Sequence, residues 1–199
     1  MGADRHGRCD RPCLPPRSAR VLPAREDVDA RGCPGGAYRP RMMRLHVAAI
    51  GRIRADAPER ALLDDYRTRF DRTARPLGLG PLTEHEVEPK KATGKGPEAE
   101  ALRRALPDGA LLVALDERGK LMTSPAFADL LARHRDDGRG DMAFVIGGAD
   151  GLDPGLRAAA DVSLSFGKMV LPHMLARVML FEQLYRAASI LAGSPYHRV

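Results

Sequence analysis

The sequence contains no apolar run close to the roughly 20 residues that a membrane-spanning helix requires. It also has no signal-peptide core before its first strand-like segment. Cysteine is absent after residue 33, which excludes a disulfide framework for the rest of the chain and fits a reducing cytoplasm. A membrane-spanning or secreted protein is therefore not expected. The 199 residues are 44% hydrophobic and 29% charged, a globular composition that suits one ordinary domain.

Charge and cysteine are concentrated at the amino end of the chain. Residues 1–42 hold nine arginines against five acidic residues, a net charge of +4, which leaves +2 of the total of +6 for residues 43–199. This segment shows no apolar periodicity, so burial cannot offset the entropy lost in ordering it. We interpret it as a disordered leader, or as upstream sequence added by a misplaced start codon, with Met42 or Met43 as the true beginning.

Other readings of residues 1–42 remain open. The arginines would suit a basic arm that binds RNA, or a targeting peptide. Cys9 and Cys13 suggest half of a zinc site, but no second pair of ligands follows at usable spacing.

From Met43 onward, apolar runs typical of strands alternate with amphipathic helical patterns. We expect strands at residues 45–50, 83–88, 110–115, 142–146 and 162–165. We expect helices at residues 57–72, 98–106, 127–135, 154–160 and 173–192. This order predicts a single α/β domain with a mostly parallel sheet that is flanked by helices on both sides.

Three predicted loops at strand ends carry unusual residues, and ligands of parallel sheets usually bind at such carboxyl ends. The loops are 115–119 (LDERG), 146–152 (IGGADGL) and 165–173 (SFGKMVLPH). The glycine turn in the second loop is weak evidence by itself, because tight structural turns use glycine equally often. The third loop is oddly apolar, which suits a flat heterocycle such as adenine bound by main-chain hydrogen bonds, or a buried crossover that only packs.

Three segments resemble the ribosomal large subunit methyltransferase H family, whose members are SPOUT-class enzymes that use S-adenosylmethionine. They are 145–152 (VIGGADGL), 164–173 (LSFGKMVLPH) and 195–198 (PYHR). Segments 43–51 (MRLHVAAIG) and 182–187 (EQLYRA) fit the same family. The resemblance therefore covers about residues 43–199, which we take as a SPOUT methyltransferase domain.

The resemblance implies a fold that periodicity alone would not suggest. It implies a SPOUT-type sheet with a C-terminal trefoil knot, in which the chain after the last strand passes under an earlier loop, although knots are very rare. It also implies a homodimer with cofactor pockets at the subunit interface. The predicted helix at residues 173–192 agrees, because its apolar residues spread over more than one face and need covering by the sheet and a partner. A central helix in a monomer is the alternative.

The resemblance also implies a reaction and its cofactor contacts. The reaction is methyl transfer from S-adenosylmethionine to N3 of a pseudouridine in 23S rRNA within the assembled 70S ribosome, and it needs no metal. The family's cofactor positions fall on Leu115, Gly147, Phe166, Gly167, Lys168, Met169, Val170 and Leu171. Gly167 stands where relatives commonly carry serine, which removes one possible hydroxyl contact but leaves the main-chain contacts.

Methylation at N3 requires the imide to lose its proton. The candidates to receive that proton or stabilise the charge are His173, Arg177, Tyr196, His197 and Arg198. For His173 the alternative is a cap at a helix start, for Arg177 a solvated neighbour of Glu182, and for the tail a frayed terminus. We place the tail at the substrate, because a Tyr-His-Arg ending suits stacking on an RNA base better than it suits packing.

Two other functions remain open: a SPOUT enzyme that acts on tRNA or another rRNA site, and a ribosome-binding factor without catalysis. A charge of +2 on residues 43–199 makes nonspecific RNA binding modest and fits recognition of a preformed ribosomal shape. Basic clusters at Arg52 and Arg54, and at Lys90, Lys91 and Lys95, could contact phosphates or remain solvated surface.

Overall fold

The computed structural model describes residues 42–88 and 94–196. Almost all of the predicted leader therefore lies outside the described residues, as do Lys90, Lys91, His197 and Arg198. None of the described helices combines the length and the apolar composition needed to cross a membrane.

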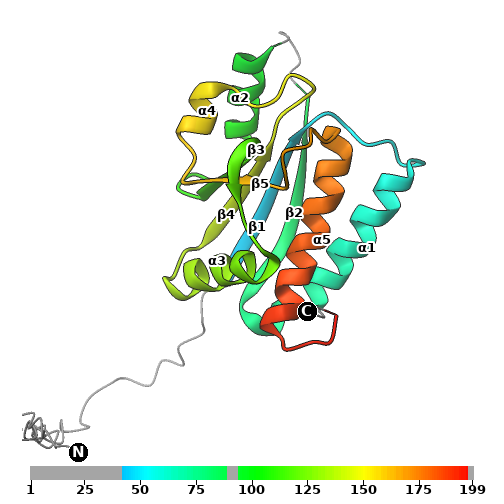
Figure 1. Cartoon of the computed structure of the whole chain (residues 1–199), viewed down its shortest axis with the longest axis vertical. Coiled ribbons are helices and arrows are strands. Elements are labelled where there is room, and N and C mark those ends of the chain that lie inside the picture. Colours follow the sequence, from blue (N-terminus) through cyan, green and yellow to red (C-terminus); the bar gives the residue numbers. More distant parts are fainter. Residues whose placement is uncertain (1–41, 89–93, 197–199) are drawn as a thin grey trace, which may run out of the picture. The chain divides into compact units, whose positions relative to one another are not determined.

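Five strands form one sheet in which every paired neighbour is parallel. They are β1 (Met43–Ile50), β2 (Leu79–Val87), β3 (Leu111–Leu121), β4 (Asp141–Ile146) and β5 (Val162–Ser165). Their spatial order is β2-β1-β4-β3-β5 (Figure 1). This arrangement confirms the predicted parallel α/β sheet.

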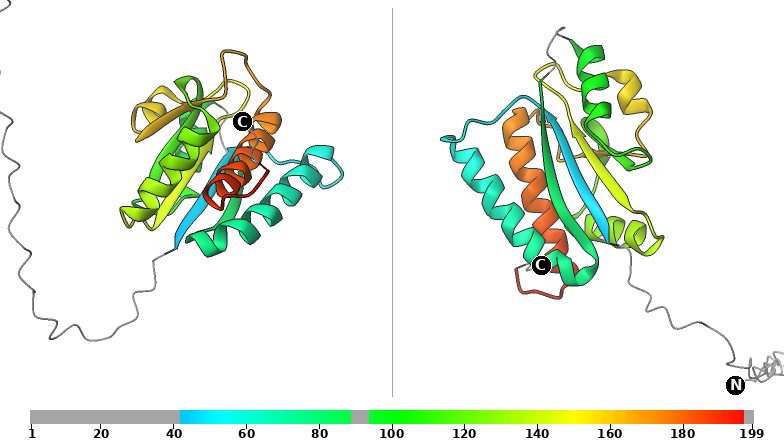
Figure 2. Two further views of the ribbon diagram at one scale, coloured as in Figure 1. Left: turned by 60° about the horizontal axis from the view of Figure 1, so that its bottom comes forward. Right: turned by 180° about the vertical axis from the view of Figure 1, so that it is seen from behind.

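Helices cover both faces of the sheet, as predicted. They are α1 (Pro58–Ala74), α2 (Lys95–Arg104), α3 (Ser124–Asp136), α4 (Pro154–Ala158) and α5 (His173–Leu191), with a 3-10 turn at Arg75–Leu77. One face carries α1, α3 and α5, and the other carries α2 and α4 (Figures 1 and 2). Helix α5 packs against both α1 and α3.

The central strands are covered on both faces, which explains why they contain apolar runs that do not alternate with polar residues. In β1, Val47 and Ala49 belong to the larger hydrophobic core under α1, α3 and α5, whereas Ala48 and Ile50 belong to the smaller core under α2 and α4. Successive side chains of a strand point to opposite faces, so a strand covered on both faces must be apolar throughout. Strand β4 follows the same rule and is equally buried.

Two strands extend at least four residues beyond their predicted limits. The prediction began β2 at residue 83, but β2 starts at Leu79; its first residues include Gly80 and Pro81, which are typical of turns. The prediction ended β3 at Leu115, where charged residues begin. After a register shift, Lys120 and Leu121 pair with β5, so β3 continues past the charged segment. The trefoil knot stays a prediction.

Candidate active site

A pocket of about 580 Å³ opens at the carboxyl ends of β4 and β5, beside residues 115–118 of β3. Most of its lining comes from the three segments singled out in the sequence, at residues 115–118, 146–152, 164–167 and 169–173. The prediction of a loop at 115–119 is wrong, because these residues belong to β3. Further side chains come from Lys95, Arg157 and Ala176. The volume lies within the range of roughly 300–1,000 Å³ usual for small-molecule sites. The two glycine-bearing loops therefore fold together, as the sequence predicted.

Gly147 gives the loop after β4 its shape. A Cβ atom on this residue would lie 2.6 Å from the carbonyl carbon of Gly151 and 2.7 Å from the nitrogen of Leu152. Real Cβ atoms do not approach backbone so closely, so the loop can fold back on itself only with glycine here. A Cβ on the next residue, Gly148, would lie 3.2 Å from Cγ2 of Ile50, so the loop also packs against the end of β1.

The loop after β5 offers main-chain groups and apolar side chains to the pocket. Met169 and Val170 are 82% and 79% exposed, although both are large and apolar. Their N–H groups, and that of Leu171, donate no hydrogen bond to any residue within 42–88 or 94–196. The loop is anchored at Ser165, whose hydroxyl lies 3.2 Å from the carbonyl oxygen of Glu117 and accepts a hydrogen bond from the N–H of Gly167 (3.1 Å).

A charged pair braces the floor of the pocket. Oδ1 of Asp116 accepts a hydrogen bond from the backbone N–H of Arg118 (2.9 Å), and Oδ2 accepts one from Nη1 of Arg157 (3.3 Å). Asp116 lies within β3 and Arg157 lies on α4, so the pair ties that short helix to the sheet. The sequence reading placed Asp116 in a notable loop but attached no role to Arg157.

Of the catalytic candidates within residues 42–88 and 94–196, His173 lines the pocket. It is half-buried and is the first residue of α5, which is preceded by Pro172 and has no side-chain cap. The alternative role as a helix cap is therefore wrong. The imidazole lies beside the end of β1, because a Cβ on Gly51 would be 3.4 Å from its Nε2.

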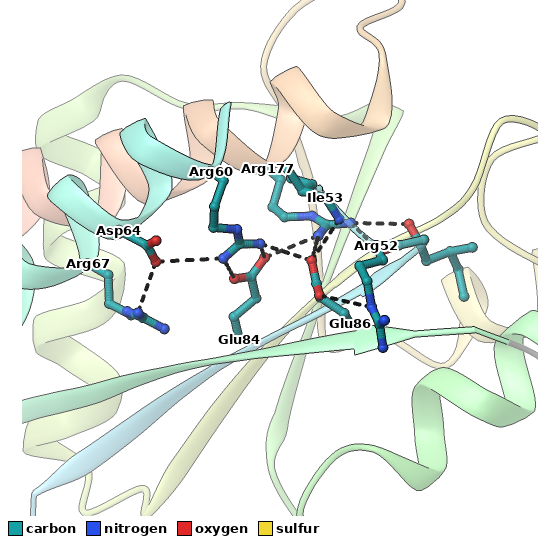
Figure 3. A network of polar contacts seen from close by, with 10 residues as sticks. Arg52, Ile53, Arg60, Asp64, Arg67, Glu84, Glu86 and Arg177 are labelled. Atoms are coloured by element: carbon teal, nitrogen blue, oxygen red, sulfur yellow. Dashed lines mark hydrogen bonds and ion pairs between the residues drawn. The ribbon is translucent and has the colours of Figure 1, made fainter. Parts of the chain in front are cut away.

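Arg177 does not line the pocket and its side chain is 0% exposed. Its Nη1 donates to Oε1 of Glu84 (3.1 Å) and to Oε1 of Glu86 (3.3 Å), both on β2 (Figure 3). The interpretation of Arg177 as a solvated neighbour of Glu182 is therefore wrong, since Glu182 binds Arg186 instead. Sequence reasoning missed Glu84 and Glu86, although two glutamates two residues apart on a strand share one face.

Tyr196 packs on the carboxyl-terminal half of α5 and not at the pocket. Its hydroxyl donates to Oε1 of Glu182 (3.2 Å), and its ring lies between the ring of Tyr185 (centroids 4.6 Å apart) and the guanidinium of Arg186 (4.9 Å). Burial and the neighbouring carboxylate of Glu182 raise the pKa of Tyr196 to about 12. The alternative of a frayed end is therefore wrong for Tyr196.

Known proteins match this chain along the region that forms the pocket. The family described as "Predicted SPOUT methyltransferase" matches residues 43–197. The chain belongs to the SPOUT methyltransferase family. Proteins named "Ribosomal RNA large subunit methyltransferase H" match from Ruegeria sp. TM1040 (64% identity), Ruegeria pomeroyi (66%) and Roseobacter denitrificans (65%). The first two matches cover 79% of this chain and 100% of the relative, and the third covers 78% and 99%.

Family membership confirms the predicted resemblance, the SPOUT-type α/β fold and the enzyme class. This SPOUT methyltransferase therefore takes its methyl group from a donor. Within residues 42–88 and 94–196, no three His, Cys, Asp or Glu side chains gather in a way that would hold a metal ion. Of the eight predicted cofactor positions, all but Lys168 line the pocket: Leu115, Gly147, Phe166, Gly167, Met169, Val170 and Leu171.

Proposed function

We propose that this SPOUT methyltransferase transfers a methyl group from S-adenosylmethionine to N3 of a pseudouridine in 23S rRNA, on the assembled 70S ribosome. The name borne by relatives that are 64–66% identical supports the class of RNA. The observation that carries the proposal is that the loops after β4 and β5 meet residues 115–118 of β3 around one pocket of about 580 Å³. A ribosomal substrate places the protein in the cytoplasm.

The pocket suits S-adenosylmethionine. The main-chain groups of residues 169–171 have no described partner and could bind the edge of adenine, while Leu115, Phe166 and Leu171 offer apolar surface to its ring. Gly147 keeps the opposing loop folded back from this space. Lys168 lies between Gly167 and Met169, which line the pocket, but does not itself line it.

The chain must supply positioning and a route for the N3 proton. S-adenosylmethionine supplies a methyl group on a sulfonium, a leaving group that departs as a neutral thioether. The pocket residues hold the reacting atoms in line, so that the N3–carbon bond forms as the sulfur–carbon bond breaks. We assign the N3 proton to the imidazole of His173, which reaches the pocket and can act as a base when neutral.

The tail serves the pocket of a second subunit in this proposal. Tyr196 is held at Glu182, which is about 14 Å along α5 from His173 at a rise of 1.5 Å per residue. His197 and Arg198 are therefore assigned to the partner's pocket, where the guanidinium would stabilise the negative charge that develops on the imide.

Exposed apolar side chains support a homodimer. Leu175 and Met179 are 45% and 38% exposed, and their spacing of four residues puts them on one face of α5. Met169 and Val170 add exposed apolar surface beside the pocket. A partner that covered these residues would remove apolar area from water and enclose the pocket at the interface.

Two measurements test the proposal. Calorimetry should show binding of S-adenosylmethionine and S-adenosylhomocysteine, and the absence of both would contradict the enzymatic reading and favour a ribosome-binding factor. Mass spectrometry of rRNA from a deletion strain should show loss of one N3-methylated pseudouridine in 23S rRNA. Loss of a methyl group from tRNA or another rRNA site, with that pseudouridine unchanged, would instead identify a different SPOUT substrate.

A further inference from the structure

A network of charged side chains lies between strand β2 and helices α1 and α5 (Figure 3). Its anions are Glu84 and Glu86 on β2, whose side chains are 5% and 26% exposed. Arg60 of α1 donates to both, at 2.6 Å to Oε2 of Glu84 and 2.9 Å to Oε1 of Glu86. Arg177 of α5 donates to both from the other side. The network thus joins β2 to the two helices that cover it.

Arg177 also binds the backbone where β1 leaves the sheet. Its Nη2 donates to the carbonyl oxygen of Ile50 (3.2 Å) and to that of Gly51 (3.0 Å). The same segment is held on its other side, because the N–H of Gly51 donates to the carbonyl of Val87 (3.0 Å) and that of Ile53 donates to Oε1 of Glu86 (2.8 Å). The bend after β1 is therefore fixed by one buried guanidinium and one carboxylate.

This bend touches both halves of the catalytic pocket. Ile50 lies against the glycine loop, since a Cβ on Gly148 would be 3.2 Å from Cγ2 of Ile50. Gly51 lies against the imidazole of His173. His173 and Arg177 are one helical turn apart on α5 and so face the same side. A shift of the bend would move the glycine loop and the imidazole together.

Stability alone gives little reason for this arrangement. Replacing a buried ion pair with apolar residues of similar size is often neutral or stabilising, because both charges must lose their water. The Nε of Arg177 is buried and has no hydrogen-bond partner among residues 42–88 and 94–196, which adds a further cost. The planar guanidinium of Arg177 supplies four N–H donors that reach two carboxylates and two carbonyls at fixed angles.

We infer that Arg177 is a positioning residue for methyl transfer: by binding the carbonyls of Ile50 and Gly51 it holds the pocket wall that supports the glycine loop and His173. This replaces direct contact of Arg177 with the substrate. The inference rests on the proposed role of the pocket as the S-adenosylmethionine site.

The test compares full-length Arg177→Lys and Arg177→Met with a control, Arg104→Met, which alters an arginine on α2 that is 76% exposed. Calorimetry measures the Kd for S-adenosylmethionine, NMR of ¹³C-labelled histidine follows the His173 ring, and thermal unfolding follows stability. A lysine has one ammonium and cannot reach all four acceptors. Both Arg177 variants should raise the Kd about tenfold and shift the His173 resonances, whereas Arg104→Met should change neither.

The outcomes separate positioning from simple stabilisation. Folded Arg177 variants with a lower melting temperature but an unchanged Kd and an unshifted His173 ring would overturn the inference. Should both fail to fold, Glu86→Gln decides, because it keeps the shape of the side chain and removes the charge. We expect its Kd for S-adenosylmethionine to rise about threefold, and an unchanged Kd would reject the positioning role of Arg177. If the wild type itself binds no S-adenosylmethionine, the proposed function fails, while the His173 resonances still test whether Arg177 positions the His173 ring.

Discussion

The hydroxyl of Tyr196 shares one carboxylate oxygen with the side chain of Arg186. Oε1 of Glu182 accepts hydrogen bonds from the Tyr196 hydroxyl (3.2 Å) and from Nε and Nη2 of Arg186 (2.9 and 2.6 Å). The ring of Tyr196 is also occupied, by Tyr185 and by the Arg186 guanidinium. These contacts leave Tyr196 as an anchor from which the last three residues begin.

Replacing Tyr196 with phenylalanine should preserve most of this anchor. Tyr196→Phe removes one hydrogen bond and keeps the ring, so the free energy of unfolding should fall by about 1 kcal/mol, with S-adenosylmethionine binding unchanged. Tyr196→Ala should reduce turnover on ribosomes much more strongly. Because the pKa of Tyr196 is raised to about 12, its phenol stays protonated at neutral pH. A step in the pH–rate profile below pH 10 that vanishes in Tyr196→Phe would contradict the role of Tyr196 as an anchor only. It would show that the phenol transfers a proton.

Mixed dimers should show whether the tail acts in the partner's pocket. One subunit lacks residues 196–199, and the other carries Gly147→Val, which disables its pocket but keeps its tail. Random assortment would produce about a quarter of the wild-type active sites if the tail acts on the partner. Methylation of ribosomes by the mixture measures this directly, with each variant alone as the inactive control. No recovery on mixing would show that each tail serves its own pocket.

Substitutions of Gly147 should abolish binding of the methyl donor through backbone strain. In Gly147→Val or Gly147→Ala the Cβ itself would collide with the backbone of Gly151 and Leu152, so the loop must open. Gly96→Ala is the matched control, because a Cβ there meets nothing within 4 Å. Calorimetry should find no binding to either Gly147 variant and wild-type binding to Gly96→Ala; retained affinity in Gly147→Ala would refute the placement.

Stability should fall as pH drops below neutrality because of a histidine pair on the sheet. Nδ1 of His46 lies 3.2 Å from Nε2 of His85, and burial, followed by the charge of His46, lowers the pKa of His85 from its usual 6.5. The unfolded chain therefore takes up this proton first, so stability is fully present above about pH 6.5 and declines below it. Urea unfolding at pH 7, 6 and 5 should show a steeper decline in the wild type than in His85→Gln. An equal decline of stability with pH in the wild type and in His85→Gln would show that His85 is not the cause.

A second decline is expected at lower pH from Asp141. Hydrogen bonds from Arg44 (2.7 and 2.8 Å) and from His46 (3.0 Å) lower the pKa of this carboxyl below its usual 3.8. Its contribution is therefore present above about pH 4 and is lost as pH falls through the lowered value. In Asp141→Asn the slope of stability against pH should be shallower below pH 4.

Removing residues 1–42 should leave methylation intact. The family match begins at residue 43, and the relatives align over 157 residues, 100% of their own length. A chain that starts at Met43 should methylate ribosomes within about twofold of the full-length rate, since the rim of the pocket is built from residues 95–176. A large loss of activity would show that residues 1–42 contribute to methylation.

The order of strands and helices could be predicted from the sequence because the apolar periodicity of each segment agrees with its burial in this fold. Strand β5 has the predicted limits, and α5 begins at the predicted His173. Helix α3 begins at Ser124, three residues before its predicted start, and the hydroxyl of Thr123 caps it by accepting the N–H of Ala126 (3.3 Å). The start of β2 was missed because Gly80 and Pro81 are residue types typical of turns.

The amino-acid sequence by itself determined the alternation of strands and helices, the family and the two glycine-bearing loops, because apolar period and glycine content are local properties. Only the tertiary structure decided that Arg177 lies behind the pocket wall and that Tyr196 is fastened to α5. The partners of a charged side chain come from distant parts of the chain: Arg177 binds residues 93 and 127 positions away. No window along the sequence contains that information, since the pairing exists only after the sheet has brought β1, β2 and α5 together.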